Sequence, residues 1–333
     1  MFPVSQKNLV NEQSRQQIFG GEKVDVKKFI DQKVEEVKKT VGSERAISAL
    51  SGGVDSSACT VLAHWAIGDS MKVVFIDDGL MREGEPQEVK KIFADLGIKV
   101  DIIHAQDDFF VALKEKIDPE EKRKAFRNTF YSVFKQAVLD SGARFLIQGT
   151  IAADIIETKG GVKTQHNILD QIGISAQEQY GYKLIEPLRD LFKHQVREVA
   201  KELGLPETIH QRMPFPGPGL ATRVVGEVTP ERVEVVRKAT VIVEEEISGL
   251  KPFQAFAVLL SDKGTGIDEG KRLFGDIIIV RSVESRDAMT AEPTPIPWEI
   301  LMTISRRMTK ELPNVVRVAY EITPKPPATI EYI

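Results

Sequence analysis

The chain has 333 residues, with 45 lysines and arginines against 49 aspartates and glutamates and a formal net charge of −4. This length exceeds one ordinary domain and predicts two, and the near balance of charges gives no support to a nonspecific binder of nucleic acid or of membrane surfaces. The single cysteine, Cys59, excludes an internal disulfide framework and a cysteine-rich zinc site, and no apolar run reaches the roughly 18 residues of a membrane span.

The N-terminal two thirds of the chain alternate short apolar runs with longer segments of helical periodicity. Residues 1–25 are polar, lack the apolar core of a signal peptide and are expected to form an arm, so we expect a cytoplasmic protein. The expected strands are residues 46–50, 72–77, 100–105, 144–150 and 183–187. The expected helices are residues 26–40, 55–67, 86–96, 119–140 and 194–203. Strand–helix alternation of this kind predicts an α/β fold with a doubly wound, mostly parallel sheet.

The pattern changes after about residue 205. Residues 213–220 read Met-Pro-Phe-Pro-Gly-Pro-Gly-Leu, which excludes regular structure there. Beyond them we expect helices at 229–247 and 298–312, strands at 254–260, 273–283 and 315–322, and a turn at 261–266. The sequence therefore predicts an arm at 1–25, a nucleotide-binding domain at 26–207 and a smaller α+β domain at 208–333.

The most informative segment lies between the first expected strand and the helix that follows it. It consists of Ser51, Gly52, Gly53, Val54, Asp55, Ser56 and Ser57. Glycines allow a close backbone approach to a ligand, and a helix N-terminus offers free N–H groups to an anion. A carboxylate beside a phosphate needs a cation between them, so Asp55 indicates Mg2+. The same segment also permits a plain glycine turn before a serine-capped helix.

This loop is neither a Walker A loop, since it lacks the Gly-Lys-Ser/Thr ending, nor a Gly-x-Gly-x-x-Gly dinucleotide motif. It resembles the PP-loop of the ATP pyrophosphatase superfamily, whose members transfer AMP and release pyrophosphate. Four further segments narrow the resemblance: residues 75–82, 148–157, 214–220 and 325–332. Together they resemble the GMP synthetase family, in particular its ATP-pyrophosphatase subunit of the two-subunit archaeal type, from about residue 20 to the C-terminus.

The resemblance implies an activity and a set of site residues. XMP would be adenylylated by ATP at its C2 oxygen, and ammonia would then displace AMP to give GMP. The implied ATP-binding residues are those of the loop together with Phe75 and Gly149. The implied XMP-binding residues are Arg82, Gln254, Lys325, Ile330 and Glu331.

Two further carboxylates and a lysine are expected near the reacting phosphates. Asp154 and Glu157 follow a strand end, where open sheets bind ligands, and Asp154 is expected to be catalytic and a second metal ligand beside Asp55. Lys163 follows two glycines in an expected lid and would neutralise charge on pyrophosphate, although a solvated loop lysine is the plain alternative. His166 is a plausible polar contact in the same lid. Arg212 and Arg223 flank residues 214–220, called the Pro-Gly segment below, and either would suit a phosphate.

The chain departs from the family pattern at several positions. Asp78 replaces a common asparagine, Gln165 replaces a histidine of the lid, and Met213 replaces a histidine before the Pro-Gly segment. The expected turn at 261–266 also differs from the family's usual sequence.

The resemblance also implies partners. Many members of the family carry a fused glutaminase with a catalytic cysteine, and we expect no room for one before Ser51. Cys59 lies inside an apolar helix and is expected to be a core residue. Ammonia would therefore come from a separate glutaminase subunit, and the C-terminal domain would form a homodimer. Two rivals stay open: NAD synthetase, which shares the PP-loop, and a non-catalytic adenine-nucleotide sensor, which has no need of a second substrate pocket.

Overall fold

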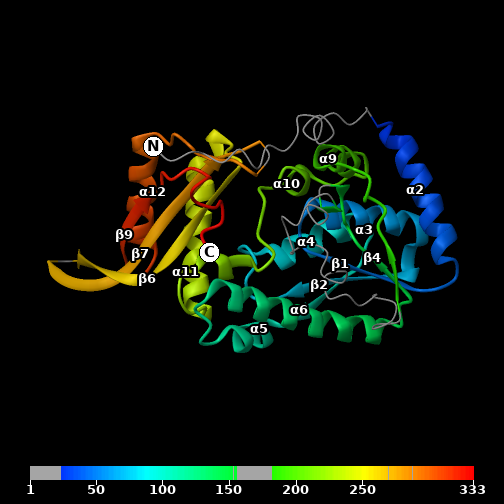
Figure 1. Ribbon diagram of the computed structural model, residues 1–333, viewed down its shortest axis with the longest axis horizontal. Coiled ribbons are helices and arrows are strands. Elements are labelled where there is room, and N and C mark those ends of the chain that lie inside the picture. Colours follow the sequence, from blue (N-terminus) through cyan, green and yellow to red (C-terminus); the bar gives the residue numbers. More distant parts are fainter. Residues whose placement is uncertain (1–23, 153, 156–181, 269, 287) are drawn as a thin grey trace, which may run out of the picture. The chain divides into compact units, whose positions relative to one another are not determined.

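The five expected strands of the N-terminal part form one sheet. A computed structural model describes residues 24–152, 154–155, 182–268, 270–286 and 288–333. The strands are β1 (Ala46–Leu50), β2 (Met71–Asp77), β3 (Val100–His104), β4 (Phe145–Ile147) and β5 (Lys183–Ile185). They lie in the order β3-β2-β1-β4-β5. Figure 1 labels three of them, β1, β2 and β4. β1 pairs in parallel with β2 and with β4, and β4 pairs in parallel with β5, so the carboxyl ends of these strands meet at one edge of the sheet.

Helices follow the strands, and those described in this part of the chain match the predicted helices except for two short ones at residues 106–113 and 207–210, which were not predicted. They are α2 (Val26–Val41), α3 (Val54–Ile67), α4 (Glu85–Asp95), α5 (Gln106–Leu113), α6 (Pro119–Ser141), α9 (Lys193–Glu202) and α10 (Glu207–His210). α2, α3 and α9 pack against one another, and α3 is buried along most of its length. Its apolar composition on every side is typical of a helix that lies inside a core. Asp118 caps α6, since its Oδ1 accepts hydrogen bonds from the N–H groups of Glu120 and Glu121.

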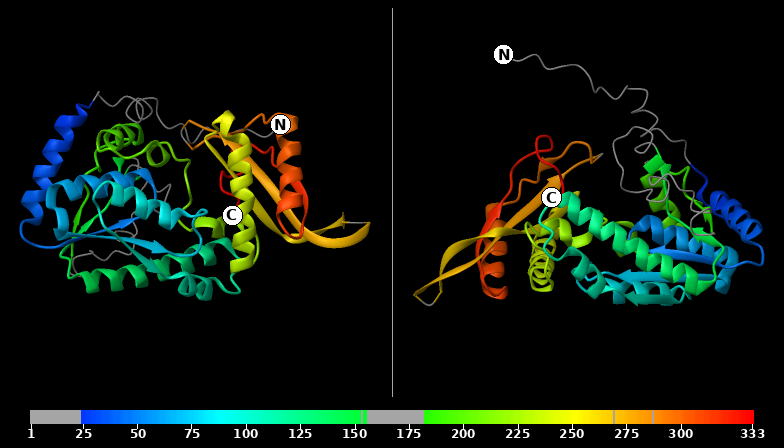
Figure 2. Two further views of the ribbon diagram at one scale, coloured as in Figure 1. Left: turned by 180° about the vertical axis from the view of Figure 1, so that it is seen from behind. Right: turned by 60° about the horizontal axis from the view of Figure 1, so that its bottom comes forward.

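The C-terminal part contains a second sheet with two long helices. Its strands are β6 (Gln254–Asp268), β7 (Lys271–Glu284), β8 (Glu292–Pro293) and β9 (Val315–Tyr320), and its helices are α11 (Pro230–Ile247) and α12 (Trp298–Glu311). β7 pairs antiparallel with β6 and β8 and parallel with β9. β6 and β7 form a long twisted hairpin, which Figure 2 shows from two sides. α11 packs on β6 and α12 on β9.

The expected turn at residues 261–266 is wrong, because these residues continue β6 across a register shift after Leu259. Their glycines serve close packing of the neighbouring strand and not a turn. A Cβ atom on Gly264 would lie 2.8 Å from the Arg317 side chain, and one on Gly266 would lie 2.7 Å from Val316. Both neighbours belong to β9, which passes too close to this part of the hairpin for any larger residue.

The structure divides into two compact units, each with its own core. One holds the described residues of Met1–Phe75, Lys90–Asp101 and Ala137–Arg212; the other holds Ile76–Val89, Ile102–Gln136 and the described residues from Met213 to Ile333. Fully buried residues of the first core are Ile47, Leu62 and Val196, and those of the second are Leu80, Phe256 and Ile278. The domain boundary at 207/208 stays a prediction. Within the described part of the chain, no helix combines the length and the apolar character needed to cross a membrane.

Candidate functional site

The glycine-rich loop at residues 51–57, called the phosphate loop below, leaves the first turn of α3 open to an anion. Its residue before the helix is Gly53, and no described side chain caps the N-terminal N–H groups there. The serines bond within the loop instead: the Ser51 N–H donates to Ser56 Oγ at 3.1 Å, and the two Oγ atoms lie 2.9 Å apart. Gly52 has a φ of +74°, which favours glycine. The structure therefore has a turn with a free helix N-terminus, and the serine-capped helix is not what forms.

The other two predicted ATP-binding residues are Phe75, beside the strand that leads into this loop, and Gly149, which lies against the loop. Phe75 pairs with Leu50, the last residue of β1, and the residue is fully buried. Gly149 follows β4, and a Cβ atom there would lie 2.8 Å from the carbonyl group of Asp55 and 2.9 Å from the nitrogen of Ser56. The end of β4 thus meets the loop at backbone distance. Val54 and Ser57 turn inward and are buried.

Asp55 lies in the first turn of α3 with its two carboxylate oxygens in different surroundings. Oδ2 accepts a hydrogen bond from Lys193 Nζ at 2.5 Å. Oδ1 is buried and has no hydrogen-bond partner among the described residues. A buried carboxylate oxygen without a donor is costly unless a ligand meets it. Among the residues that the structure describes, no three His, Cys, Asp or Glu gather into a metal-binding group, so any cation here would depend on phosphate oxygens and water as well.

Lys193 is a candidate that sequence reasoning missed. It is the first residue of α9, where a positive charge opposes the helix dipole. An unfavourable charge at a helix start is a readable signal that the residue has another partner. Its ammonium group, about half exposed, lies on Asp55 at the mouth of the phosphate loop. Arg212 reaches the same loop, since its Nη1 donates to the Gly52 carbonyl at 3.4 Å.

Asp154 lies in a short helical segment after β4. Its Oδ2 accepts a hydrogen bond from the Ile151 N–H at 3.0 Å, so this carboxylate also stabilises the local turn. The predicted lid residue Lys163, together with Glu157, Gln165 and His166, lies outside the described residues. The proposed catalytic and metal-binding roles of these residues stay predictions.

Cys59 is a core residue, as its place in an apolar helix predicts. Its side chain is buried, and its thiol donates to the Gln148 carbonyl at 3.2 Å. Burial raises the pKa of the Cys59 thiol far above its usual value. A thiol held in this way lacks the thiolate character that a nucleophile requires.

The loop after β2 begins with a buried carboxyl group. Asp78 Oδ1 accepts a hydrogen bond from the Leu80 N–H at 2.8 Å, and the side chain is almost fully buried. Burial raises the pKa of Asp78 to about 7; the Leu80 N–H lowers this pKa, and the nearby carboxylates of Asp77 and Glu85 raise it further. A carboxyl group with this pKa is largely protonated in mildly acidic solution and then resembles the asparagine common in the family.

We expect Asp78→Asn to stabilise the protein above pH 7. The folded-state pKa of Asp78 lies above the ordinary value, so its contribution to stability is greatest below about pH 4 and is lost as the pH rises through about 7. The full difference is on the order of 4 kcal/mol. Urea unfolding of both proteins at pH 8 and pH 5 should show an advantage for the variant that shrinks at pH 5. An equal advantage at both values would contradict the assignment.

The same loop carries Arg82, whose guanidinium group is almost buried. Its Nη2 donates to the Met213 carbonyl at 2.9 Å, and its Nε lies 3.9 Å from a carboxylate oxygen of Glu244 on α11. The guanidinium carbon lies 4.3 Å from the ring centre of Phe215. Arg82 is thus held against the Pro-Gly segment by a carbonyl, a carboxylate and an aromatic face.

α11 and the Pro-Gly segment fix this loop from two sides. Arg237 Nε donates to the Met81 carbonyl at 3.0 Å and Nη2 to the Gly79 carbonyl at 2.5 Å. The Leu220 N–H donates to the Leu80 carbonyl at 2.8 Å. A pocket of about 560 Å³ lies beside the loop. Its lining includes Asp77, Arg82, Gln106, Phe110, Glu231, Glu234 and Arg237.

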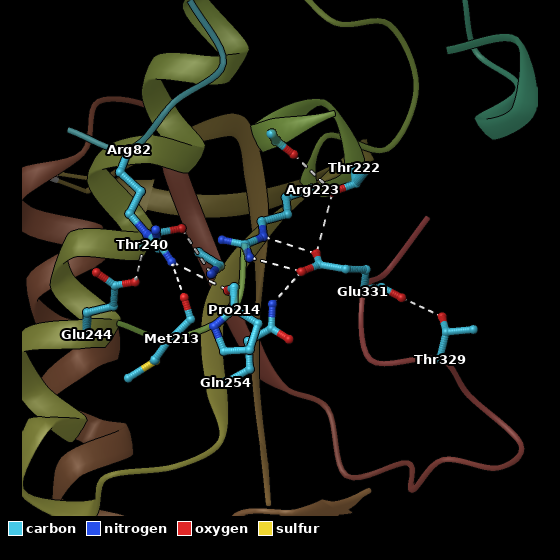
Figure 3. Close-up of polar contacts among 12 residues, drawn as sticks. Arg82, Met213, Pro214, Thr222, Arg223, Thr240, Glu244, Gln254, Thr329 and Glu331 are labelled. Carbon is cyan, nitrogen blue, oxygen red and sulfur yellow. Dashed lines mark hydrogen bonds and ion pairs between the residues drawn. The ribbon is translucent and has the colours of Figure 1, made fainter. Parts of the chain in front are cut away.

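The structure brings Gln254 and Glu331 together, although they lie 77 residues apart in sequence. Gln254 Nε2 donates to Glu331 Oε1 at 2.5 Å (Figure 3). Arg223 donates to the same carboxylate twice, from Nε at 3.1 Å and from Nη2 at 3.0 Å. Thr222 Oγ1 adds a longer contact of 3.5 Å. Arg223 therefore offers no guanidinium group to a phosphate, contrary to the expectation for this residue, because it is buried and already paired with Glu331.

The remaining predicted XMP residues lie on the same C-terminal tail. Lys325 forms two backbone hydrogen bonds with Ala291, and its ammonium group donates to the Ala288 carbonyl at 2.8 Å. Arg281, fully buried on β7, donates to the carbonyls of Thr323 and Thr329 and so holds the tail on both sides of Lys325. Ile330 is half-buried beside Glu331. The tail is therefore ordered by specific contacts.

The two parts of the chain match two family models. The model described as NAD synthase matches residues 23–220, and the model described as GMP synthase C terminal domain matches residues 243–332. The first match covers the sheet with the phosphate loop, and the second covers strands β6 to β9 and the tail as far as residue 332.

Curated relatives match almost the whole chain. A subunit of the glutamine-hydrolysing GMP synthase of Pyrococcus furiosus is 54% identical over 308 residues, which cover 92% of this chain and 97% of the relative. The subunits of the same name from Thermococcus kodakarensis and Archaeoglobus fulgidus are 55% and 53% identical, over 91% and 93% of this chain and 98% and 100% of the relatives. Among solved structures, an NH3-dependent NAD synthetase from Campylobacter jejuni is 17% identical, with a TM-score of 0.44 over 57% of this chain and 78% of the other, a similarity too low to support a comparison of sites.

Proposed function

This chain belongs to the family of the synthetase subunit of glutamine-hydrolysing GMP synthase, a ligase of two-subunit type, and we propose that it converts XMP to GMP through an adenylyl-XMP intermediate. The observation that carries the proposal is the contact between Gln254 and Glu331 at 2.5 Å. Two residues predicted to bind XMP from distant segments meet in one cluster, and this supports a second substrate site in addition to the phosphate loop.

The chemistry has two steps. The C2 oxygen of XMP attacks the α-phosphorus of ATP, a phosphorus–oxygen bond forms, and pyrophosphate leaves with its bonding electrons. Ammonia then attacks C2, loses a proton, and AMP leaves with the oxygen. The open N-terminus of α3 and the loop backbone would bind the pyrophosphate and stabilise its charge as it departs. Lys193, beside Asp55, would add positive charge at the same place.

Magnesium fits the carboxylate at the phosphate loop. Asp55 Oδ1 is buried without a hydrogen-bond donor in the described structure, and Mg2+ prefers one or two carboxylates together with phosphate oxygens and waters. We propose Asp55 as its ligand, with Asp154 as a second candidate. A bound Mg2+ would neutralise charge on the phosphates of ATP.

The partners of this chain are part of the proposal. The relatives are named as one subunit of a glutamine-hydrolysing enzyme, which implies a further subunit in those proteins. We propose that ammonia reaches this chain from a separate glutaminase subunit. The predicted homodimer also remains a proposal; the exposed apolar residues Ile267, Phe274 and Trp298 of the C-terminal part are compatible with an interface.

NAD synthetase is the second candidate that a specific observation favours. The NAD synthase model matches residues 23–220, which include the phosphate loop. The GMP synthase C terminal domain model matches residues 243–332, which include the cluster around Glu331, and an NAD synthetase would not need this part. A nucleotide sensor likewise leaves the tail without a role.

The test is an assay with the purified chain, ATP, Mg2+ and XMP, with ammonium or with glutamine as the nitrogen source. AMP, pyrophosphate and GMP are followed by chromatography, and nicotinic acid adenine dinucleotide replaces XMP in a parallel reaction. We expect GMP with ammonium and none with glutamine. The proposal fails if ATP binds but XMP yields neither AMP nor GMP with ammonium present.

A further inference from the structure

We propose that Arg223 is a positioning residue: it fixes Glu331 at the XMP site and does not itself touch XMP. The inference rests on the proposed function and adds to it a residue that acts through another. Arg223 ends the short 3-10 helix η3 (Gly219–Arg223), which follows the Pro-Gly segment. It lies 108 residues from Glu331 in sequence, yet donates two hydrogen bonds to that carboxylate.

The burial of Arg223 distinguishes its positioning role from direct contact with XMP, which we assign to Glu331. Its side chain is 1% exposed, whereas that of Glu331 is 23% exposed. A substrate can therefore reach the carboxylate but not the guanidinium group. The paired hydrogen bonds from Nε and Nη2 set both the place and the plane of the carboxylate, as is typical of Arg–carboxylate pairs.

Two aromatic rings hold the guanidinium group itself. Its carbon lies 4.1 Å from the ring centre of Phe256 on β6 and 4.9 Å from that of Phe215 in the Pro-Gly segment. Planar guanidinium groups stack on aromatic faces, and an ammonium group does not reproduce this contact or the paired hydrogen bonds. Arg82 lies on the same Phe215 ring at 4.3 Å. Phe215 thus connects the buried arginine with an arginine predicted to bind XMP.

The opposite charges of Arg223 and Glu331 make each residue depend on the other. A buried guanidinium group needs a paired anion, and removal of either partner leaves an uncompensated charge. Glu331 lies in a segment with little regular structure, and such a segment is poorly ordered unless specific contacts hold it. Arg223, with Gln254 as a second donor, supplies these contacts at the carboxylate.

The experiment compares Arg223→Lys, Arg223→Met and Glu331→Gln with the wild type. XMP affinity is measured by calorimetry, and KM and kcat are measured in the ammonium-dependent reaction. We expect Arg223→Lys to raise the Kd and KM for XMP by about 10- to 100-fold, because a misplaced carboxylate loses its contacts. In the same variant, the KM for ATP should change by less than about threefold. The exposed ion pair of Arg307 with Glu311 on α12 gives the control Arg307→Lys, which should leave both constants unchanged.

The double variant Arg223→Met/Glu331→Gln shows whether Arg223 acts through Glu331. If it does, the double variant binds XMP no more weakly than Glu331→Gln alone. Losses that multiply would overturn the proposal, since Arg223 would then have its own effect on XMP. So would an unchanged Kd in Arg223→Lys. If Arg223→Met does not fold, the comparison of Glu331→Gln with Arg223→Lys/Glu331→Gln carries the same test.

A readout without substrate separates this proposal from the proposed function. The Ile333 N–H donates to the Thr222 carbonyl at 3.3 Å, so hydrogen exchange at the chain end reports the docking of the tail. Arg223→Lys should speed exchange in the last residues at least tenfold relative to Arg307→Lys. If the wild type makes no GMP but Arg223→Lys still speeds exchange, the proposed function is refuted and the positioning by Arg223 stands. If the wild type makes GMP but exchange in Arg223→Lys is unchanged, the positioning alone is refuted.

Discussion

Asp55→Asn is expected to lower GMP formation at saturating ATP by about three orders of magnitude while the protein stays folded. A metal ion at phosphoryl oxygens contributes several kcal/mol to transition-state stabilisation, and each 1.36 kcal/mol corresponds to a factor of ten. Asparagine keeps the size of the side chain but removes the anionic oxygens, of which Oδ1 has no donor in the described structure. The measurement is the initial rate of AMP and GMP release as a function of Mg2+ concentration.

The fold should tolerate this change. The pair of Asp55 with Lys193 is partly exposed, at 26% and 49%, and exposed pairs contribute about 0–1 kcal/mol. The aspartate in the first turn of α3 adds a similarly small helix-dipole term. Lys193→Met is the matched variant, because it removes the other partner of the pair and leaves the carboxylate. It should keep the Mg2+ dependence of the wild type and lose activity by a smaller factor. An Asp55→Asn variant that retains a tenth or more of wild-type activity would exclude Asp55 as the metal ligand.

The sheet with the phosphate loop was predictable because local signals there agree. Short apolar runs such as 46–50 and 72–77 alternate with helical segments, and the observed strands Ala46–Leu50 and Met71–Asp77 match them closely. α5 (Gln106–Leu113) escaped prediction. It is a short helix after β3 with two buried residues, Phe109 and Leu113. A segment of this length is too short to show a clear helical periodicity in the sequence.

The hairpin shows why local turn signals fail when packing decides. Asp-Lys-Gly-Thr-Gly reads as a turn, but Gly264 and Gly266 are required where β9 passes close to β6. That requirement comes from residues 316 and 317, about 50 positions later in the chain. A sequence pattern limited to neighbouring residues contains no information about this contact.

The site shows the same division between local and distant information. The phosphate loop is continuous in sequence, so its residue types reveal its chemistry directly. From the sequence, Arg223 suited a phosphate as well as Arg212 did. Only the fold reveals that Arg223 is buried against Phe256 and paired with Glu331. Lys193 carried a local signal, a positive charge at a helix start, that sequence reasoning did not use.

Gly149→Ala should damage both ATP binding and stability through a contact between backbones. The added Cβ atom would lie 2.8 Å from the carbonyl carbon and oxygen of Asp55 and 2.9 Å from the nitrogen of Ser56. These are main-chain atoms in the first turn of α3, so no flexible side chain can move aside. Either the end of β4 or the phosphate loop must shift, and overpacking of this kind costs about 1–3 kcal/mol in the free energy of unfolding.

The effect on ATP should exceed the effect on stability, because the shifted atoms belong to the turn whose N–H groups would bind pyrophosphate. A displacement of about 1 Å in a positioned group can cost on the order of 100-fold, and we expect the Kd for ATP, measured by calorimetry, to rise by about that factor. Gly249→Ala is the matched control, since a Cβ atom there meets nothing within 4 Å. If Gly149→Ala bound ATP and unfolded like this control, the loop would not depend on the close approach of β4, and the phosphate site would need a different geometry.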